Sequence, residues 1–283
     1  MLLPALRGSG QILFQPSALT GSLFLLLVLS QSVWGLGLCV SGLVGATLSA
    51  RALEPGSQAF RDGVGGFNGA LAGLALWALF EATPELPLIA FVSGALTGLV
   101  RVGLLRFVPL PPFTAPFVIV TWLVEYAGRV LLNLEAASPP SFSAGTAFAA
   151  ATNASQVLFV SVPWVGAFVI LAVAFHSRGA AVWVALASVV AWLTTAGSFG
   201  LLPADLAAEG LLGYNALILA AAMHMLDVPR SLALVAVMAS VWLSALFFLA
   251  PVATLSAPFV LVIWLVISGQ AWWDRRGMWG HPN

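Results

Sequence analysis

The chain has 283 residues, of which 61% are hydrophobic and only 7% charged, and its mean hydropathy is +1.04. A soluble globular domain, in which about 25% of residues are charged, is therefore excluded, and a polytopic membrane protein is predicted. The formal net charge is zero, there is no lysine, and Cys39 is the single cysteine, so neither a nucleic-acid partner nor a disulfide framework is expected.

Apolar runs follow one another along the whole chain. Because a membrane-spanning helix needs about 20 mostly apolar residues, these runs predict about ten spans and an all-α membrane fold. The first five spans are expected at residues 12–29, 33–51, 64–81, 86–106 and 114–134. The second five are expected at residues 157–175, 179–200, 210–225, 231–250 and 256–273. The run "SLFLLLVLS" could pass for a signal-peptide core, but another apolar run begins at Val33, so we interpret it as the first span.

The arginines favour one orientation of the ten predicted spans in the membrane, since basic residues are enriched in cytoplasmic loops. With the N-terminus inside, only Arg129 falls on the other side. The arginines then on the cytoplasmic side are Arg7, Arg51, Arg61, Arg101, Arg106, Arg178, Arg230, Arg275 and Arg276. The predicted location is a plasma membrane, specifically a bacterial inner membrane, with both termini cytoplasmic.

Three pairs of segments recur in the same order. They are "GQILF" and "SQVLF" with Gln11 and Gln156, "GGFNGALAGLAL" and "LGYNALILAAAM" with Asn68 and Asn215, and "TAPFVIVTWLV" and "SAPFVLVIWLV" beginning at Thr114 and Ser256. Their separations are 145, 147 and 142 residues. Matches at nearly one separation indicate an internal duplication, with repeats at residues 1–137 and 138–283.

Each predicted repeat has an odd number of spans, so the second copy enters the membrane from the opposite side. Inverted repeats commonly place a permeation or binding site where the two copies meet. Before Gln156 the chain reads "SPPSFSAGTAFAAATNAS", which predicts a half-membrane helix, and "MLLPALRGSG" before Gln11 would be its shorter twin. Carbonyls at the end of such a helix need protein or a watery cavity around them. The alternative for this segment is an interfacial loop.

The paired motifs resemble the urea transporter family over nearly the whole chain. The resemblance rests on "LRGSGQILFQ", "GGFNGALAGL" and "TAPF", with the second-half forms "NASQVLF", "GYNALIL" and "SAPF". It implies five helices and one half-spanning helix per repeat, a homotrimer in membrane lipid, and a central urea pore in each protomer. Gln156 is neutral where the family often has a glutamate.

The paired residues fit a urea pathway. Urea is flat and neutral, so its selection requires an apolar slot edged by hydrogen-bond acceptors. Phe14, Phe67, Phe159 and Tyr214 are predicted to form the slot, Gln11 and Gln156 to supply acceptors, and Thr114 and Ser256 to meet at the midplane. By family analogy Leu71 and Ile218 narrow the passage. Pro116 and Pro258 are expected to free backbone carbonyls, and Asn68 and Asn215 to hold buried backbone.

Other roles for these aromatic, polar and charged residues remain open. Aromatic residues in membrane helices usually pack or anchor, and polar residues often only join helices. Glu125 and Arg129 can form an i,i+4 ion pair, either structural or at a subunit interface, or Glu125 could couple protons. A proton-coupled or passive transporter of another small amide, or of ammonia, is therefore the alternative function. Neither G-x-S-x-G nor H-E-x-x-H occurs, so no enzyme, cofactor or metal is predicted.

Overall fold

The computed structural model describes residues 1–137 and 148–275, which are called here the first and second halves. The first half contains α1 (Leu2–Gly10), the 3-10 helix η1 (Gln11–Leu13), α2 (Ala18–Gln31), α3 (Val33–Leu53), α4 (Gln58–Arg61), α5 (Phe67–Leu79), α6 (Leu86–Phe107) and α7 (Ala115–Val130). The second contains α8 (Ala149–Ser155), η3 (Gln156–Leu158), α9 (Pro163–Ala174), α10 (Arg178–Ala196), α11 (Ala204–Ala208), α12 (Tyr214–Met225), α13 (Arg230–Phe247) and α14 (Ala257–Arg275).

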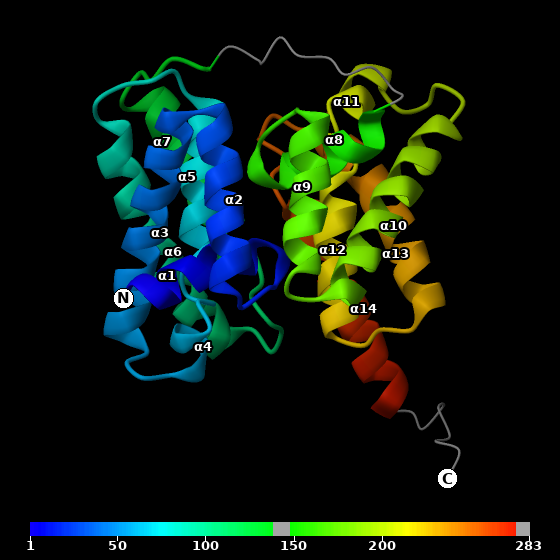
Figure 1. Ribbon diagram of the computed structural model, residues 1–283, viewed down its shortest axis with the longest axis horizontal. Helices are drawn as coiled ribbons and strands as arrows, with labels where there is room; N and C mark the ends of the chain where they lie inside the picture. Colours follow the sequence, from blue (N-terminus) through cyan, green and yellow to red (C-terminus); the bar gives the residue numbers. More distant parts are fainter. Residues whose placement is uncertain (138–147, 276–283) are drawn as a thin grey trace.

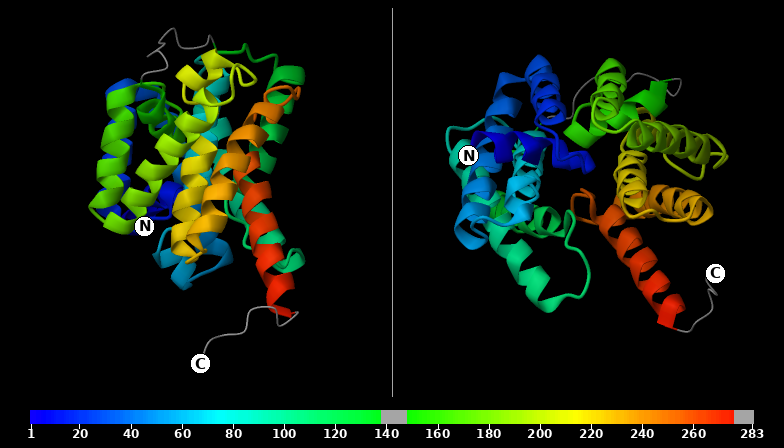
Figure 2. Two further views of the ribbon diagram at one scale, coloured as in Figure 1. Left: turned by 90° about the vertical axis from the view of Figure 1, so that its right-hand side faces the viewer. Right: turned by 60° about the horizontal axis from the view of Figure 1, so that its bottom comes forward.

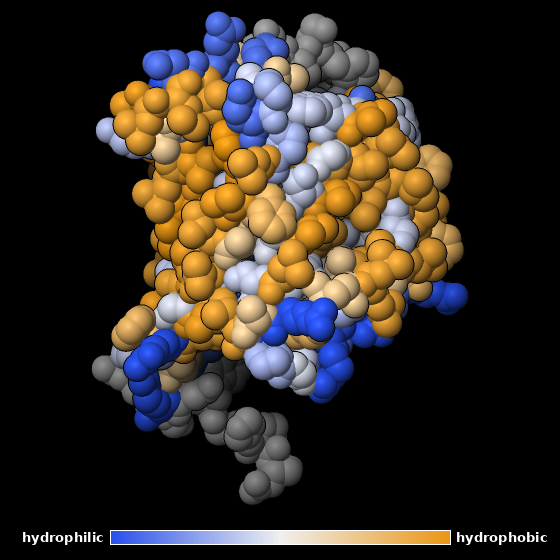
Figure 3. Space-filling view, turned by 90° about the vertical axis from the view of Figure 1, so that its left-hand side faces the viewer, coloured by the Kyte–Doolittle hydropathy of each residue, from blue (hydrophilic) through white to orange (hydrophobic). Residues whose placement is uncertain are grey.

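Apolar helices dominate the described residues, as composition predicts. Four of them, α3, α6, α10 and α13, are long and apolar enough to cross a membrane, and there are six such spans if each of two bent helix pairs counts as one. A broad apolar band lies between hydrophilic ends on the face shown in Figure 3. The protein is therefore a multi-pass helical membrane protein, and the count of ten spans stays a prediction.

The two halves lie side by side and present their elements in the same order (Figure 1). In that view α1 and α4 lie toward the bottom of the first half, whereas α8 and α11 lie at the top of the second. Helices α2 and α9 pack against each other across the boundary between the halves. The right-hand view of Figure 2 also shows the two halves on either side of this boundary.

The predicted spans 12–29 and 157–175 are wrong as continuous helices. The chain bends by 76° between residues 2–13 and 18–31, and by 69° between 149–158 and 163–174. At the bends Phe14 and Phe159 have φ of 58° and 59°, in the left-handed region that bulky residues rarely adopt. Pro16 lies inside the first bend, and α2 begins only at Ala18.

The segments predicted as half-membrane helices contain the short helices α1 and α8, each followed by a single 3-10 turn, and their depth in a membrane stays a prediction. Residues 138–147 of the predicted second half-helix lie outside the described residues. The predicted spans 64–81 and 210–225 begin too early, because turns precede α5 and α12. The short helices α4 and α11 were not predicted.

Two glycines let these turns pass over the half-helices. Gly63 and Gly210 have φ of 79° and 78°, and a Cβ on Gly63 would lie 2.3 Å from the Gly8 nitrogen. A Cβ on Gly210 would lie 2.5 Å from the Thr152 carbonyl carbon. A side chain fits neither position, by conformation or by space.

Glycines also bring α3, α5 and α6 together backbone to backbone. A Cβ on Gly42 of α3 would lie 2.1 Å from the Gly69 oxygen of α5, and one on Gly94 of α6 would lie 2.0 Å from the Gly42 oxygen. A Cβ on Gly45 would lie 2.0 Å from the Phe91 oxygen. Because lipid gives no hydrophobic drive for helix association, close packing through small residues holds this half together.

Candidate functional site

The buried hydroxyls of Thr114 and Ser256 meet between the two halves. Ser256 Oγ donates to Thr114 Oγ1 at 2.6 Å, and the two residues are 0% and 2% exposed. Each directly precedes a helix, α7 or α14, and each follows a residue with positive φ, Phe113 at 45° or Leu255 at 44°. The two turns therefore aim one hydroxyl from each half at the same point.

Side-chain amides fix these turns. Asn68 donates from Nδ2 to the Phe113 carbonyl at 3.1 Å and accepts from the Phe117 N–H at 3.2 Å. Asn215 makes the same pair of bonds, to the Leu255 carbonyl at 3.1 Å and to the N–H of the third residue of α14 at 3.4 Å. Both amides are almost wholly buried and bond to backbone.

Pro116 and Pro258 are the second residues of α7 and α14. In a first helical turn the N–H has no intrahelical partner, so proline costs nothing there. The predicted role of freeing carbonyls stays a prediction, and the carbonyls of the preceding turns have partners within the protein. The Phe113 and Leu255 carbonyls accept from asparagine amides, and the Pro112 carbonyl accepts from the Ala115 N–H at 2.9 Å.

The two glutamines anchor the half-helices to the turns that cross them. Gln11 donates from Nε2 to the Asp62 carbonyl at 3.0 Å, and Gln156 donates to the Glu209 carbonyl at 2.9 Å and to Ser161 Oγ at 2.5 Å. Within the described part of the chain, the amide oxygens of both glutamines receive no hydrogen bond.

Partial burial, with the Asp205 carboxylate as the smaller cause, raises the pKa of the Glu209 carboxyl.

The predicted aromatic residues pack across the boundary. The Phe14 ring lies 6.5 Å from Phe67 and 6.0 Å from Phe259 of α14, measured between centroids. Phe159 lies 6.3 Å from Phe117 of α7. The ring that follows each half-helix thus contacts a ring supplied by the other half. The Tyr214 hydroxyl donates to the Leu255 carbonyl, so Tyr214 also holds the turn before Ser256.

One cavity gathers the predicted residues of the first half. It has a volume of about 330 Å³ and is lined by Gln11, Phe14, Phe67 and Phe113, with Arg101 at its edge. Arg101 is ion-paired with Glu54. The second-half counterparts Gln156, Phe159 and Tyr214 do not line this cavity. Leu71 and Ile218 are 2% and 3% exposed and belong to the apolar core.

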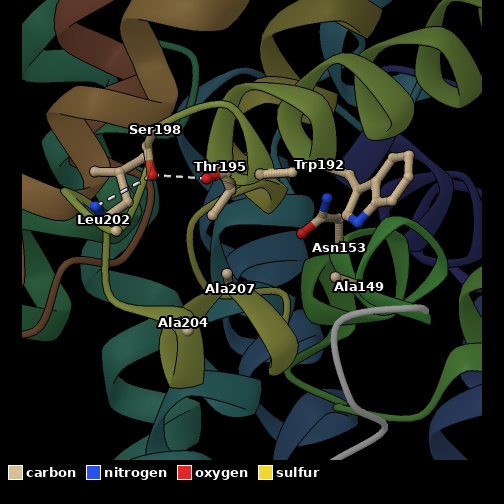
Figure 4. Close-up of a pocket in the computed structure, with 10 residues that line it drawn as sticks. Ala149, Asn153, Trp192, Thr195, Ser198, Leu202, Ala204 and Ala207 are labelled. Atoms are coloured by element: carbon tan, nitrogen blue, oxygen red, sulfur yellow. Dashed lines mark hydrogen bonds between the residues drawn. The ribbon is translucent and has the colours of Figure 1, made fainter.

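A second cavity, of about 200 Å³, lies beside α8 (Figure 4). Asn153, Trp192 and Thr195 line it, and none of the predicted pathway residues does. Asn153 donates to the Ser188 carbonyl at 3.3 Å, and Ser198 donates to the Thr195 carbonyl at 2.7 Å. Because its polar groups are bonded within the protein, we interpret this space as a packing cavity.

A third cavity, of about 550 Å³, lies between α7 and the segment before α14. Glu125 and Arg129 line it and form the expected ion pair, with 3.1 Å between Arg129 Nη2 and Glu125 Oε1. The Arg129 guanidinium also lies 5.7 Å from the centre of the Phe80 ring. The two charges therefore neutralise each other, and none of the predicted pathway residues lines this cavity.

Sequence reasoning missed several residues of this boundary. Trp122 Nε1 donates to the Ala253 carbonyl at 2.7 Å, and Trp264 Nε1 donates to the Pro111 carbonyl at 2.8 Å, so each half bonds to the other in the same way. The repeated segments contain both tryptophans and also Phe117 and Phe259. The duplication was thus the available signal. The buried hydroxyl of Thr121 finds no partner among the described residues. The duplication does not mark Thr121, because the equivalent residue in the second repeat is Ile263.

Helices with an apolar outer band, and halves that meet at a buried polar contact, define a multi-pass membrane protein of transporter type. The family model for urea transporters matches residues 2–271. The chain belongs to the urea transporter family, a family of membrane transport proteins and not of enzymes, so the resemblance of the paired motifs is confirmed.

Proposed function

We propose that the protein conducts urea passively along a path between its two halves. The observation that supports this most directly is the contact of Thr114 with Ser256 between the halves. A cavity lies next to it in the chain, lined by Gln11, Phe14 and Phe67 and by Phe113, the residue before Thr114. Membership of the urea transporter family supports urea as the solute.

The contacts suggest how a flat amide would be handled. Rings at the cavity present apolar faces, while the Gln11 amide oxygen can accept from the solute because its nitrogen is already bonded to Asp62. The Ile12 carbonyl is a second acceptor: among the described residues it receives no hydrogen bond, since Pro16, four positions on, has no N–H. Each acceptor replaces water lost by the urea amides, which would otherwise cost several kcal/mol.

At the hydroxyl pair the solute meets both a donor and acceptors. Ser256 uses its proton on Thr114, so the Thr114 proton remains for the urea carbonyl, and the Ser256 lone pairs remain for urea N–H groups. A hydroxyl is suited to this point because it serves either end of the solute. The rings of Phe159 and Phe117 then continue the path into the second half.

We also propose the finer architecture. Residues 1–137 and 138–283 form two inverted repeats of five spans, each with a half-membrane helix, in a bacterial inner membrane with both termini cytoplasmic. The opposite placement of α4 and α11 (Figure 1) and the reciprocal tryptophan bonds support this arrangement. The arginine distribution supports the orientation.

Passive conduction predicts a specific flux behaviour. In stopped-flow measurements on proteoliposomes, urea flux is expected to rise almost linearly at low gradients and to be independent of membrane potential, pH and a protonophore. The reason is that Arg101, the charged side chain that lines the cavity, is ion-paired with Glu54, and the other residues of the proposed path are neutral. Empty liposomes provide the background. Glu125→Gln is the matched test of proton coupling, since Glu125 lies with Arg129 away from this path. Loss of flux with the protonophore, or with Glu125→Gln in a folded protein, would favour the coupled transporter instead.

A homotrimer is the second expectation, and it rests on the family alone. Light scattering of the purified protein in detergent, corrected for bound detergent, is expected to give three protomers of 29.4 kDa. Urea flux per protomer should not depend on the others if each contains its own path. A monomer with full flux would separate assembly from transport.

A further inference from the structure

The second half contains an apolar groove. It lies between α10 and α13 outside α12, helices that lie side by side in Figure 1, and it measures about 440 Å³. Its lining is apolar apart from Arg230 at one end. The lining includes Leu186, Ala187, Val190, Ala220 and Leu234.

Glycine replacement explains why the groove exists. Ser32 and Ser177 cap α3 and α10 in the same way, so the two helices can be aligned at these serines. In that alignment Gly42 corresponds to Ala187 and Gly45 corresponds to Val190. The Asn68 and Asn215 pair likewise equates Gly73 with Ala220.

In the first half these glycines permit backbone contact among α3, α5 and α6. In the second half all three equivalent side chains line the groove, so α13 cannot approach α10 as closely as α6 approaches α3.

The groove borders the face that would contact lipid. Leu186 and Leu234, which line it, are 58% and 47% exposed, as is Val182 at 57%. In a bilayer this face lies in hydrocarbon, where water does not fill an apolar space and an acyl chain does.

Positive charge lies at one end of the groove. Arg178 and Arg230 are the first residues of α10 and α13, which both begin at the bottom of Figure 1. His224 stacks on Trp183, another groove residue, with 6.3 Å between the ring centroids. Asp227 is the one acidic residue in the turn between α12 and α13, so Arg178, Arg230 and Asp227 together carry a net positive charge. By contrast, Glu85 precedes α6 at the equivalent place in the first half.

We propose that this groove binds one acyl chain of an anionic phospholipid, with the phosphate at Arg230 and Arg178. A guanidinium makes strong, charge-assisted hydrogen bonds to phosphate, and basic sites between membrane helices on the cytoplasmic side suit anionic head groups. The apolar groove alone would accept any lipid, and the arginines select the anionic one.

The test titrates delipidated, detergent-solubilised protein with dioleoylphosphatidylglycerol or dioleoylphosphatidylcholine, with bound lipid counted by native mass spectrometry. The wild type is expected to prefer phosphatidylglycerol. Arg230→Gln should weaken that binding about five- to tenfold, in keeping with the loss of one arginine near a lipid phosphate. It should weaken phosphatidylcholine binding less, because the choline cation offsets the phosphate charge of that lipid. Arg51→Gln is the matched control, because it removes the same charge at the exposed end of α3, away from the groove.

Val190→Phe tests the acyl-chain part independently, because the added ring would occupy the groove. It should reduce binding of both lipids while Arg230 is intact, with an unchanged size-exclusion profile. If it does not fold, the exposed Arg230→Gln variant decides the proposal alone. Equal binding of both lipids by the wild type, or equal effects of Arg230→Gln and Arg51→Gln, would overturn it. A change in protomer number with Val190→Phe would also overturn it, because the groove would then be a subunit contact.

Discussion

Replacing both buried hydroxyls, as Thr114→Val with Ser256→Ala, is expected to slow urea flux about ten- to a hundredfold while the protein stays folded. The pair lies 2.6 Å apart between the halves, so its loss leaves an apolar constriction where urea gives up hydrogen bonds without replacement. Each neutral hydrogen bond is worth about 0.5–1.5 kcal/mol net, and about 1.4 kcal/mol in a barrier is a tenfold change in rate. The measurement is stopped-flow flux per reconstituted protomer.

Single variants and a matched threonine give this experiment its controls. Thr114→Val and Ser256→Ala alone should fall between wild type and double mutant, because either hydroxyl still bonds the solute. Thr97→Val removes a hydroxyl that is equally buried but bonded within α6, to the Gly94 carbonyl at 2.7 Å, and should leave flux unchanged. Unchanged flux in a folded double mutant would mean that Thr114 and Ser256 only join the halves.

A large loss of stability is expected for Gly42→Ala. The new Cβ would lie 2.1 Å from the Gly69 carbonyl oxygen, a backbone atom that can move only if α3 and α5 separate. Overpacking of this kind typically costs about 1–3 kcal/mol and occasionally more. The midpoint of thermal aggregation, followed by size exclusion in detergent, should fall clearly below that of the wild type.

Gly37→Ala is the control for that variant, on the same helix. Gly37 is exposed, and a Cβ there would meet nothing within 4 Å, so the midpoint should stay the same or rise slightly because alanine favours helix. Equal midpoints for the two variants would show that the close approach of α3 to α5 is not what stabilises the first half.

The duplicated motifs were the most informative part of the sequence, for a physical reason. Two copies of one fold must bring equivalent residues to their shared boundary, so Thr114 and Ser256 could be paired before any coordinates were known. The same reasoning reached the buried amides Asn68 and Asn215, since a polar side chain inside an apolar run needs fixed partners.

Backbone conformation was much less accessible from sequence. Phe14 and Phe159 end their 3-10 turns with positive φ, which nothing about phenylalanine favours, so the helices before and after them were predicted as single spans. Turn residues 64–66 and 210–213, directly before α5 and α12, are glycine or apolar, so hydropathy cannot separate them from the helices that follow. The contacts of Phe14 with Phe259 and of Phe159 with Phe117 depend on which helices adjoin across the boundary, which the pattern within one half does not contain.

The aromatic contacts across the boundary bear on how the protein is made. Phe14 is translated well before its partner Phe259, which lies in α14, the last helix of the described residues. The first half can close early through its glycine contacts, while the proposed path gains its walls only when α14 arrives. A nascent chain that ends before α14 would lack Phe259, and with it one wall of the proposed path.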